Sequence, residues 1–340
     1  MKKGFAITLA VVGVVAVAAV IALNETPAQT QLNFRTVNDD NVDFNHYMSR
    51  FSKNYKTPEE YNQRLALYKK TMATINSHNA NNGGSFFLRP NKFTDMTKEE
   101  YKKLLGFKPS NKIYKRAVSQ KDPSTIPDAI DWRDKGVVNE VKDQAQCGSC
   151  WAFSTVGALE SRTAIKTGKL QSLSEQQLVD CDTQDGNQGC NGGDMGTAMT
   201  YIASNPLETE DDYPYAGYDE SCQADQSKEI VSDQGPVAVT PSSSDALKAA
   251  VAEGPVSVAI EADTDVFQSY GGGILNDDSC GTNLDHGVVV VGYGSENGQE
   301  YYIVRNSWSS TWGENGYVRI AIVDGDGICG IQMQPVYPQV

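Results

Sequence analysis

A cysteine lies at the start of a stretch whose residue types could support nucleophilic chemistry. The run Gln144-Ala-Gln-Cys-Gly-Ser-Cys150 leads into apolar residues at helical spacing from Trp151 to about Thr167. We therefore expect Cys150 at a helix N-terminus, beside backbone N–H groups without intrahelical partners and at the positive end of the macrodipole. That position favours the thiolate, which is the form of cysteine that attacks electrophiles.

A thiolate nucleophile needs a base, and the chain has three histidines, His46, His78 and His286. A lone histidine is more often a packed core residue than a base, and His46 and His78 are most simply surface or packing residues. His286 differs because it opens a valine-rich run of buried-strand character, 136 residues after Cys150. Asn306 follows in an Arg-Asn-Ser-Trp segment.

These motifs resemble the papain family of cysteine peptidases, in which a C-G-S-C-W signature surrounds the nucleophile. The resemblance implies that Cys150 attacks, that His286 pairs with the thiol through one ring nitrogen, and that the amide of Asn306 orients the ring through the other. It also implies that the side-chain amide of Gln144 and the backbone N–H of Cys150 form an oxyanion hole. The indole of Trp308 would shield the His286–Asn306 contact from water.

The same resemblance places a substrate-binding cleft, in which Gly192 and Gly193 pair with the substrate backbone. The S2 pocket, which holds the P2 side chain, would be lined by Asp194, Met195, Ala259, Leu284 and Gln334. The three apolar residues of this set predict Leu, Val or Phe at P2. The polar residues leave alternatives open: Gln334 either folds aside into solvent or binds a polar P2 group, and Asp194 would favour Arg over Glu.

The seven cysteines all lie beyond residue 146, and an odd number in a secretory-type chain suggests disulfides plus one reactive thiol. Six cysteines permit fifteen pairings, among which the sequence alone does not choose. The resemblance implies the pairs Cys147–Cys190, Cys181–Cys222 and Cys280–Cys329, with Cys150 free. A zinc site is weakly supported, because the Cys147-x-x-Cys150 spacing has no second matching pair nearby. We expect neither a metal nor another cofactor.

Residues 1–23 have the composition of a secretory signal, since two lysines precede a mostly apolar run, Phe5–Leu23. This run just reaches membrane-spanning length, so an uncleaved signal-anchor stays an alternative. A signal combined with disulfides predicts the secretory pathway, leading to a lysosome, an acidic vacuole or the exterior.

Charge divides the remaining chain near Ile126. Residues 1–125 carry a net charge of +9 and residues 126–340 carry −23, which together give the total of −14. Opposite charges on the two sides of one junction suit an inhibitory propeptide, residues 24–125, bound to its own peptidase domain, residues 126–340. The stretch 108–125, rich in Ser, Lys and Pro, is predicted to be the exposed linker where processing occurs.

The basic segment contains a predicted helix that begins at Pro58, with Thr57 as N-cap and Glu60 completing a capping box. The series Glu60, Arg64, Tyr68, Thr71, Ile75 and Asn79 has the spacing of the ERFNIN helix of cathepsin L-like proregions. It departs from that pattern at Tyr68 and Thr71. The run Asn91-Lys-Phe-Thr-Asp95 resembles the companion proregion motif, with an arginine where a glycine is usual.

We expect an α+β, papain-like two-lobe fold after a helical propeptide domain, with the resemblance covering roughly residues 45–340. The left lobe is predicted to be helical, with a second helix at 174–180 that Ser174 and Gln177 cap as a capping box. The right lobe is predicted to be β-rich, with strands at 256–260, 288–293, 301–306 and 317–322. The active-site cleft would lie between the lobes.

The predicted function is that of a cysteine endopeptidase, made as an acid-activated zymogen and acting through an acyl-enzyme. No insertion follows Cys190, which favours an endopeptidase over an exopeptidase. The alternatives are a catalytically inactive peptide-binding homologue and a peptide ligase of the same fold. Expected partners are protein and peptide substrates, the chain's own propeptide as an intramolecular inhibitor, and cystatin-like inhibitors. We expect a monomer and no nucleic acid.

Overall fold

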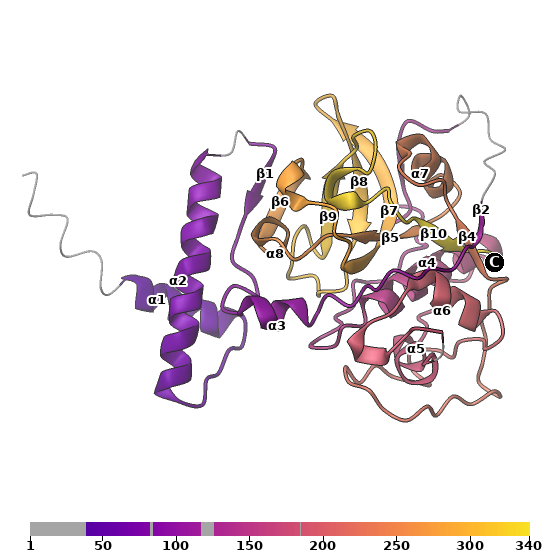
Figure 1. Cartoon of the computed structure of the whole chain (residues 1–340), viewed down its shortest axis with the longest axis horizontal. Coiled ribbons are helices and arrows are strands. Elements are labelled where there is room, and N and C mark those ends of the chain that lie inside the picture. The colour runs from indigo at the N-terminus through magenta and orange to yellow at the C-terminus, as the bar shows by residue number, and fades with distance from the viewer. Residues whose placement is uncertain (1–38, 82–83, 117–125, 184) are drawn as a thin grey trace, which may run out of the picture. The chain divides into compact units, whose positions relative to one another are not determined.

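The computed structural model describes residues 39–81, 84–116, 126–183 and 185–340 (Figure 1). The chain separates into two units, residues 1–46 and 47–340. Helix α1 (Asp39–Arg50) begins in the first unit. The signal or signal-anchor predicted at 1–23 lies outside the described residues. Within the described ranges, no helix combines the length and the apolar character needed to cross a membrane.

Helix α2 (Pro58–Asn81) begins where the sequence predicts. The Thr57 hydroxyl accepts a hydrogen bond from the backbone N–H of Glu60 at 3.1 Å, which satisfies one donor of the first turn. The Glu60 carboxylate reaches back to the backbone N–H of Lys56 at 2.9 Å, one residue earlier than a standard capping box. The cap therefore fixes the start of the longest propeptide helix.

Two of the series residues attach α2 to the rest of the propeptide. Arg64 forms a two-pronged ion pair with Glu100 of helix α3 (Lys98–Lys102), with an Nη2–Oε1 distance of 2.6 Å. Asn79 donates to the carbonyl of Leu88 and accepts from its N–H, both at 2.8 Å, and so attaches α2 to strand β1 (Phe86–Leu88). Bidentate contacts of this kind fix orientation as well as distance.

The strands form one path. It runs through the segment predicted to be the propeptide and through residues 126–340, which are called the peptidase segment after the sequence prediction. Its order is β1-β6-β9-β8-β7-β5-β10-β4-β2, with β3 paired to β7. The strands not yet placed are β2 (Lys115–Arg116), β3 (Ile130–Asp131), β4 (Pro236–Ala238), β5 (Val256–Ile260), β6 (Tyr270–Leu275), β7 (His286–Glu296), β8 (Gln299–Arg305), β9 (Tyr317–Ala321) and β10 (Val336–Pro338). All four strands predicted from the sequence are present as β5, β7, β8 and β9.

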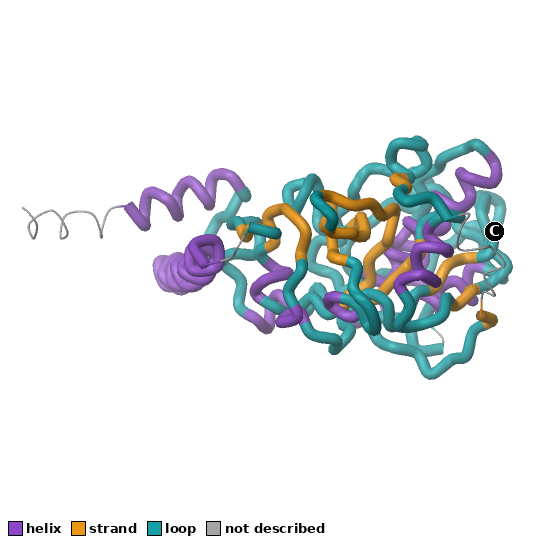
Figure 2. The backbone as a smooth tube through the Cα atoms, turned by 90° about the horizontal axis from the view of Figure 1, so that it is seen from above, coloured by secondary structure: helices purple, strands orange, loops and turns teal. Residues whose placement is uncertain are grey.

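The helices of the peptidase segment concentrate before residue 203. They are α4 (Cys150–Thr167), α5 (Glu175–Cys181), α6 (Met195–Ile202), α7 (Ser244–Val251) and α8 (Asp265–Gln268), with short 3₁₀ turns at Gly189–Asn191, Asp278–Cys280 and Ile328–Gly330. Figure 1 shows α4, α5 and α6 together on one side of β5 and β7. Loops join most of these short elements, as Figure 2 shows in teal. The arrangement is the predicted α+β fold with a helical and a β-rich lobe.

One half of the predicted second capping box is absent. The Ser174 hydroxyl accepts from the backbone N–H of Gln177 at 3.0 Å, as expected for the N-cap of α5. The Gln177 side chain, however, donates to the carbonyl of Pro206 and accepts from the N–H of Glu208. A buried amide satisfies both its donor and its acceptor there, so it does not return to the cap.

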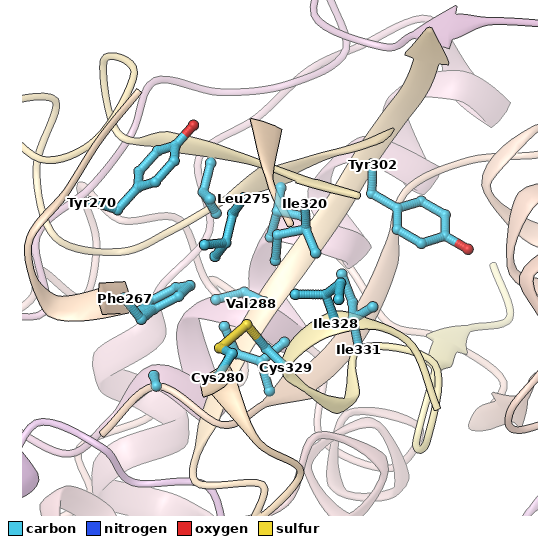
Figure 3. Packing of buried hydrophobic residues seen from close by; sticks show 14 of the residues in the cluster. Phe267, Tyr270, Leu275, Cys280, Val288, Tyr302, Ile320, Ile328, Cys329 and Ile331 are labelled. Atoms are coloured by element: carbon cyan, nitrogen blue, oxygen red, sulfur yellow. A yellow bond between two sulfur atoms is a disulfide. The ribbon is translucent and has the colours of Figure 1, made fainter. Parts of the chain in front are cut away.

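Each lobe has its own buried apolar cluster. The helical lobe centres on Trp151, Leu178 and Met199, whereas the larger cluster of the β-rich lobe surrounds the Cys280–Cys329 disulfide (Figure 3). The other two disulfides are Cys147–Cys190 and Cys181–Cys222, and Cys150 is the free cysteine. These pairs are the ones that the resemblance implies.

Candidate active site

Cys150 is the first residue of α4, and its side chain is fully buried. The helix is attached to the β-rich lobe by hydrogen bonds made one turn into it. The Ser154 hydroxyl donates to the carbonyl of Val288 at 2.7 Å, and the Ser257 hydroxyl donates to the carbonyl of Ser154 at 2.9 Å. These contacts place the start of α4 against β7, next to Gly287, whose N–H donates to Cys150 Sγ at 3.3 Å.

His286 and Asn306 meet because of strand topology. His286 is the first residue of β7, and Asn306 follows the last residue of its antiparallel neighbour β8, so both lie at the same end of the pair. His286 Nε2 lies 2.8 Å from Asn306 Oδ1. The Trp308 indole stacks on the imidazole at 4.6 Å between ring centroids and is itself buried.

Burial favours the neutral forms of Cys150 and His286. It raises the pKa of the Cys150 thiol to about 11, and it lowers the pKa of His286 to about 4. His286 Nδ1 has no hydrogen-bond partner among the described residues. Sγ instead accepts from two backbone N–H groups, those of Gly287 and of Gly106 in the propeptide, both at 3.3 Å. The thiol–imidazole hydrogen bond expected from the resemblance is therefore not formed in this state.

The Gln144 side chain is held on both sides. Its Oε1 accepts from the Ser307 hydroxyl at 2.7 Å and from Trp308 Nε1 at 3.1 Å. Its Nε2 donates to the carbonyls of Cys147 and of Leu104 in the propeptide, both at 2.8 Å. The amide that is the candidate oxyanion donor thus already binds a propeptide carbonyl. Sequence reasoning missed Ser307, whose position between Asn306 and Trp308 was its one signal.

A propeptide strand lies in the cleft beside Cys150. Gly193 donates to the carbonyl of Gly106 at 2.8 Å and accepts from the N–H of Lys108 at 2.9 Å, in parallel pairing. Phe107 donates to the carbonyl of Asp285 at 2.9 Å. A Cβ on Gly106 would lie 1.7 Å from the Gly148 carbonyl oxygen, so only glycine allows this close approach.

The residues predicted to line S2 divide into two groups. Met195, Ala259 and Leu284 belong to the same apolar cluster as Phe107, whose ring is buried there. Gln334 is exposed at the wall of an adjacent cavity. The carboxylate of Asp194 accepts from the N–H of Thr197 at 2.8 Å as the N-cap of α6. Gly192 has φ 109° and lies close to the propeptide backbone at Gly106.

Most of residues 108–115 are exposed, as predicted for a linker over 108–125, but this first half also binds to the rest of the chain. Residues 108–116 lie on the peptidase segment: Lys108 pairs with Gly193, the Tyr114 hydroxyl donates to Asp194 at 2.8 Å, and β2 pairs with β4. Hydrophilic composition predicted the exposure but not these contacts, which are backbone pairing, the phenol of Tyr114 and polar contacts of Lys108 and Lys112. The remainder, residues 117–125, lies outside the described residues.

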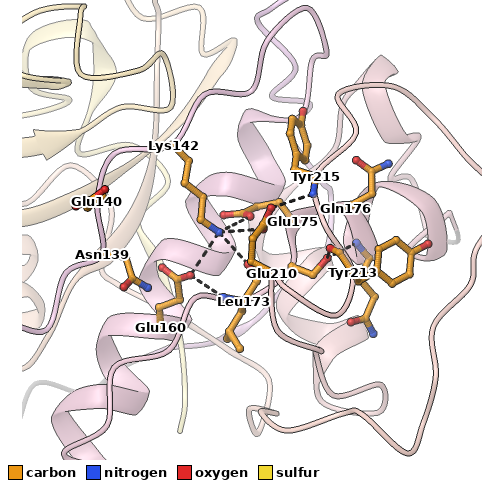
Figure 4. A network of polar contacts seen from close by, with 12 residues as sticks. Asn139, Glu140, Lys142, Glu160, Leu173, Glu175, Gln176, Glu210, Tyr213 and Tyr215 are labelled. Atoms are coloured by element: carbon orange, nitrogen blue, oxygen red, sulfur yellow. Dashed lines mark hydrogen bonds and ion pairs between the residues drawn. The ribbon is translucent and has the colours of Figure 1, made fainter.

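A buried ionic cluster underlies the helical lobe (Figure 4). The Lys142 ammonium lies 2.6 Å from Glu175, 3.2 Å from Glu210 and 3.7 Å from Glu160. Burial alone would lower the pKa of Lys142, but the three carboxylates outweigh it and raise that pKa. Burial raises the pKa of Glu175 well above its ordinary value. Arg305 adds a second, longer ion pair to Glu160 at 3.8 Å.

Lys142→Met should destabilise the protein by about 3–5 kcal/mol at pH 7, because it leaves buried carboxylates without their main counter-ion. Carboxyls with raised pKa values stabilise the fold in acid and lose that contribution as pH rises. The difference from the parent should therefore shrink at pH 4.5. Urea unfolding at both pH values, in a Cys150→Ala background, measures this. The exposed Lys166→Met variant is the control, and an equal loss in both variants would contradict the role of the cluster.

Fold and site together define a two-lobe protein whose cleft is filled by its own N-terminal segment. A model described as papain family cysteine protease matches residues 126–339, and one described as cathepsin propeptide inhibitor domain (I29) matches residues 44–101. The chain belongs to the papain family of cysteine proteases, with a propeptide of the cathepsin type.

Relatives and solved structures agree with this placement. The chain is 47% identical to cysteine proteinase RD21A of Arabidopsis thaliana over 82% of its own length, but it spans only 62% of that relative. It is 42% identical to the cathepsin L-like proteinase of Phaedon cochleariae, covering 84% of this chain and 90% of the relative. Digestive procathepsin L 3 of Tenebrio molitor larval midgut superposes with a TM-score of 0.82 at 39% identity, covering 88% of this chain and 99% of that structure.

Proposed function

We propose that this chain is the precursor of a cysteine endopeptidase that acts through Cys150, His286 and Asn306. In the processed enzyme, the Cys150 thiolate attacks the scissile carbonyl carbon, and the carbonyl oxygen becomes an oxyanion. Protonated His286 gives its proton to the departing amine, which leaves a thioester acyl-enzyme. A water molecule then attacks the thioester with His286 as base, releases the acid product and restores the starting pair.

The observation that carries this proposal is the orientation of the imidazole. Asn306 Oδ1 holds Nε2 at 2.8 Å, beneath the Trp308 ring. The other nitrogen, Nδ1, has no partner in the described part of the chain, and it lies at the strand end whose next residue contacts Cys150 Sγ. When the propeptide leaves and water enters, desolvation no longer disfavours the charged forms, so thiolate and imidazolium can form together.

The proposal is tested by acidifying the purified precursor and treating the product with an irreversible epoxide inhibitor. Mass mapping should find the label on Cys150, and hydrolysis of protein substrates should stop in proportion to labelling. Label on another residue, or full labelling without loss of hydrolysis, would contradict the assignment of the nucleophile.

Gln144→Ala should lower kcat by roughly 10²–10³ with little change in KM, because an oxyanion donor acts mainly in the transition state. The bonds from Ser307 and Trp308 to its Oε1 support this role, since they aim Nε2 toward the cleft. Steady-state kinetics on a fluorogenic peptide measures kcat and KM separately.

Gln144→Glu is the matched control, because it keeps the shape and replaces the donating amide with an acceptor. It should be at least as slow as Gln144→Ala. A variant changed only in KM would mean that Gln144 binds substrate and does not stabilise the oxyanion.

Latency has a physical basis in the propeptide contacts. The carbonyl of Leu104 accepts a hydrogen bond from the amide of Gln144, and the N–H of Gly106 contacts the thiol. The ring of Phe107 packs in the apolar cluster predicted to form S2. The propeptide aromatics Phe93 and Tyr101 also pack edge-on against Trp308, at 5.0 and 5.7 Å. A substrate cannot enter while these places are filled.

Ion pairs across the propeptide interface predict acid activation. Lys92–Asp143, Lys102–Asp263 and Lys112–Asp185 lie at 2.7, 2.7 and 2.9 Å, all partly exposed. Such pairs contribute only a few-fold each and weaken in salt. The hydrogen bonds from Arg64 lower the pKa of Glu100. The stability that this ion pair gives to the propeptide is therefore lost only at a lower pH than that of an ordinary carboxylate pair. Precursor should stay latent at pH 7 and convert about tenfold faster or more near pH 4–5, as followed by gel and N-terminal sequencing.

The triple variant Asp143→Asn, Asp185→Asn, Asp263→Asn keeps side-chain size and removes three charges. It should convert several-fold faster than the parent at pH 6 and respond less to salt. Parent precursor that converts equally fast at pH 7 and 4.5 would contradict the electrostatic switch.

We further propose passage through the secretory pathway to an acidic compartment or the exterior. The three disulfides support this, because such bonds persist in oxidising compartments. Cystatin-like inhibitors are proposed partners, since the cleft accepts a polypeptide segment, and the enzyme is proposed to act as a monomer.

A further inference from the structure

The propeptide residue Tyr114 lies against helix α6. Its hydroxyl donates to Asp194 Oδ1 at 2.8 Å and lies 3.3 Å from the Thr197 hydroxyl. A Cβ on Gly196 would come within 2.4 Å of the tyrosine ring, so the ring rests directly on the helix backbone where glycine leaves room. Burial and the negative charge of Asp194 raise the pKa of Tyr114 to about 12, which keeps the phenol a hydrogen-bond donor.

This site is separate from the place that Phe107 occupies. A cavity of about 160 Å³ lies between the two rings, and Gln334, Pro335 and Val336 form part of its wall. Removal of the propeptide vacates both ring sites and leaves one continuous hollow. The apolar set Met195, Ala259 and Leu284 would take one side chain of a bound polypeptide, and the surface at Gly196 would be free for a second.

Asp194 gives the second position its chemistry. The residue is 8% exposed, and the oxygen that caps α6 through the Thr197 N–H is the same Oδ1 that accepts the phenol. Loss of Tyr114 removes one of these two donors. A buried carboxylate is stabilised by a hydrogen-bond donor, and the apolar surface around it is stabilised by contact with a ring. A phenol supplies both the donor and the ring.

The backbone after Tyr114 is held as well. Strand β2 pairs in parallel with β4, so β4 becomes an edge strand once the propeptide leaves. An extended polypeptide can add to such an edge through main-chain hydrogen bonds. The ring site and the edge are therefore adjacent parts of one surface.

We propose that Gly196, Asp194 and Thr197 form a tyrosine-binding site on the mature enzyme, distinct from S2, which Tyr114 occupies in the precursor. Its ligand after processing is a tyrosyl side chain in the extended part of a polypeptide substrate, N-terminal to P2. The substrate part rests on the proposed proteolysis, whereas binding of a tyrosyl peptide does not.

Binding is tested with a fluorescent peptide of residues 104–116 and processed Cys150→Ala enzyme, which does not cleave the peptide and leaves room for Gly106. Anisotropy should show Tyr114→Phe binding about tenfold more weakly, which is the low end for a hydrogen bond to a charged acceptor. Tyr114→Ala should bind at least about thirtyfold more weakly, because the ring contact is lost as well.

The Gly196→Ala enzyme completes a double-mutant cycle, since its added methyl group occupies the ring position. On this enzyme the parent and Tyr114→Ala peptides should differ by less than about threefold. The proposal is overturned if the affinities of the Tyr114→Ala and parent peptides for the parent enzyme differ by less than about twofold. It is also overturned if the Tyr114→Ala peptide loses as much affinity on Gly196→Ala as on the parent enzyme.

Substrates with a leucine at P2 and one tyrosine scanned from P3 to P9 test the second part. At one or two neighbouring positions, kcat/KM should exceed that of the matching phenylalanine peptide about fivefold, and Gly196→Ala should remove the difference. If tyrosine is preferred at none of these positions, the substrate role is overturned. An enzyme that cleaves no peptide at all refutes the proposed proteolysis, while the anisotropy result still decides the tyrosine site.

Discussion

Cys150→Ala and His286→Ala should each abolish peptide hydrolysis, lowering kcat by roughly 10⁵–10⁶, and the double variant should be no slower than either alone. The two residues act as one unit, because a thiol that cannot lose its proton and an imidazole without a thiol leave the same slow background. The start of α4 and the start of β7 bring them together, with Gly287 N–H on Sγ at 3.3 Å. Hydrolysis of a fluorogenic peptide by processed enzyme measures the loss.

Asn306→Ala is the graded control for this prediction. Asn306 orients the ring through Nε2 and transfers no proton, so its loss should be smaller than that of either partner. Processing of inactive variants requires a trace of active enzyme, which carries an affinity tag and is removed on resin before the assay, because an epoxide inhibitor would also label Cys150 of Asn306→Ala. Substantial hydrolysis by Cys150→Ala after that treatment would exclude Cys150 as the nucleophile.

Gly106→Ala should remove latency. The added Cβ would lie 1.7 Å from the carbonyl oxygen of Gly148, and both are backbone positions that no side-chain rotation relieves. The strand that carries Leu104 and Phe107 would have to leave the cleft, which frees the amide of Gln144 and the thiol. We expect the uncleaved precursor to hydrolyse peptides at pH 7, with the propeptide at least about a hundredfold weaker as an inhibitor.

Lys103→Ala is the matched control, since that side chain is exposed three residues earlier in the same segment. It should leave the precursor latent. Activity is to be read within minutes at neutral pH, with gels showing an intact chain. A Gly106→Ala precursor that stays as latent as the control would mean that this strand is not what blocks the site.

The positions of the candidate active-site residues could be predicted from the sequence better than the segment that covers them. Cys150 could be placed because an apolar period and a helix start are local patterns. His286 and Asn306 needed the family resemblance, since their meeting depends on antiparallel pairing between β7 and β8, which no local pattern encodes.

The failures have a common physical origin. Residues 108–116 look like a free linker because four of the nine are Lys or Arg and most are exposed, yet backbone pairing and the phenol of Tyr114 bind them to the peptidase segment. Gln177 looks like a capping residue, but buried partners at Pro206 and Glu208 compete successfully for its amide. Tertiary hydrogen bonds decide both cases, and composition carries no information about them.

The direction of the propeptide strand has a consequence for maturation. At the thiol, the propeptide presents the N–H of Gly106, and its carbonyl at Leu104 is held by Gln144. The sulfur therefore accepts a hydrogen bond from a peptide nitrogen, and the carbonyl oxygen bound by Gln144 belongs to Leu104, two residues before that nitrogen. While seated, the segment is a bound ligand that its own molecule does not digest. The first cut must fall on chain that has left the cleft or be made by another molecule, so early conversion should accelerate with precursor concentration and with a seed of finished enzyme.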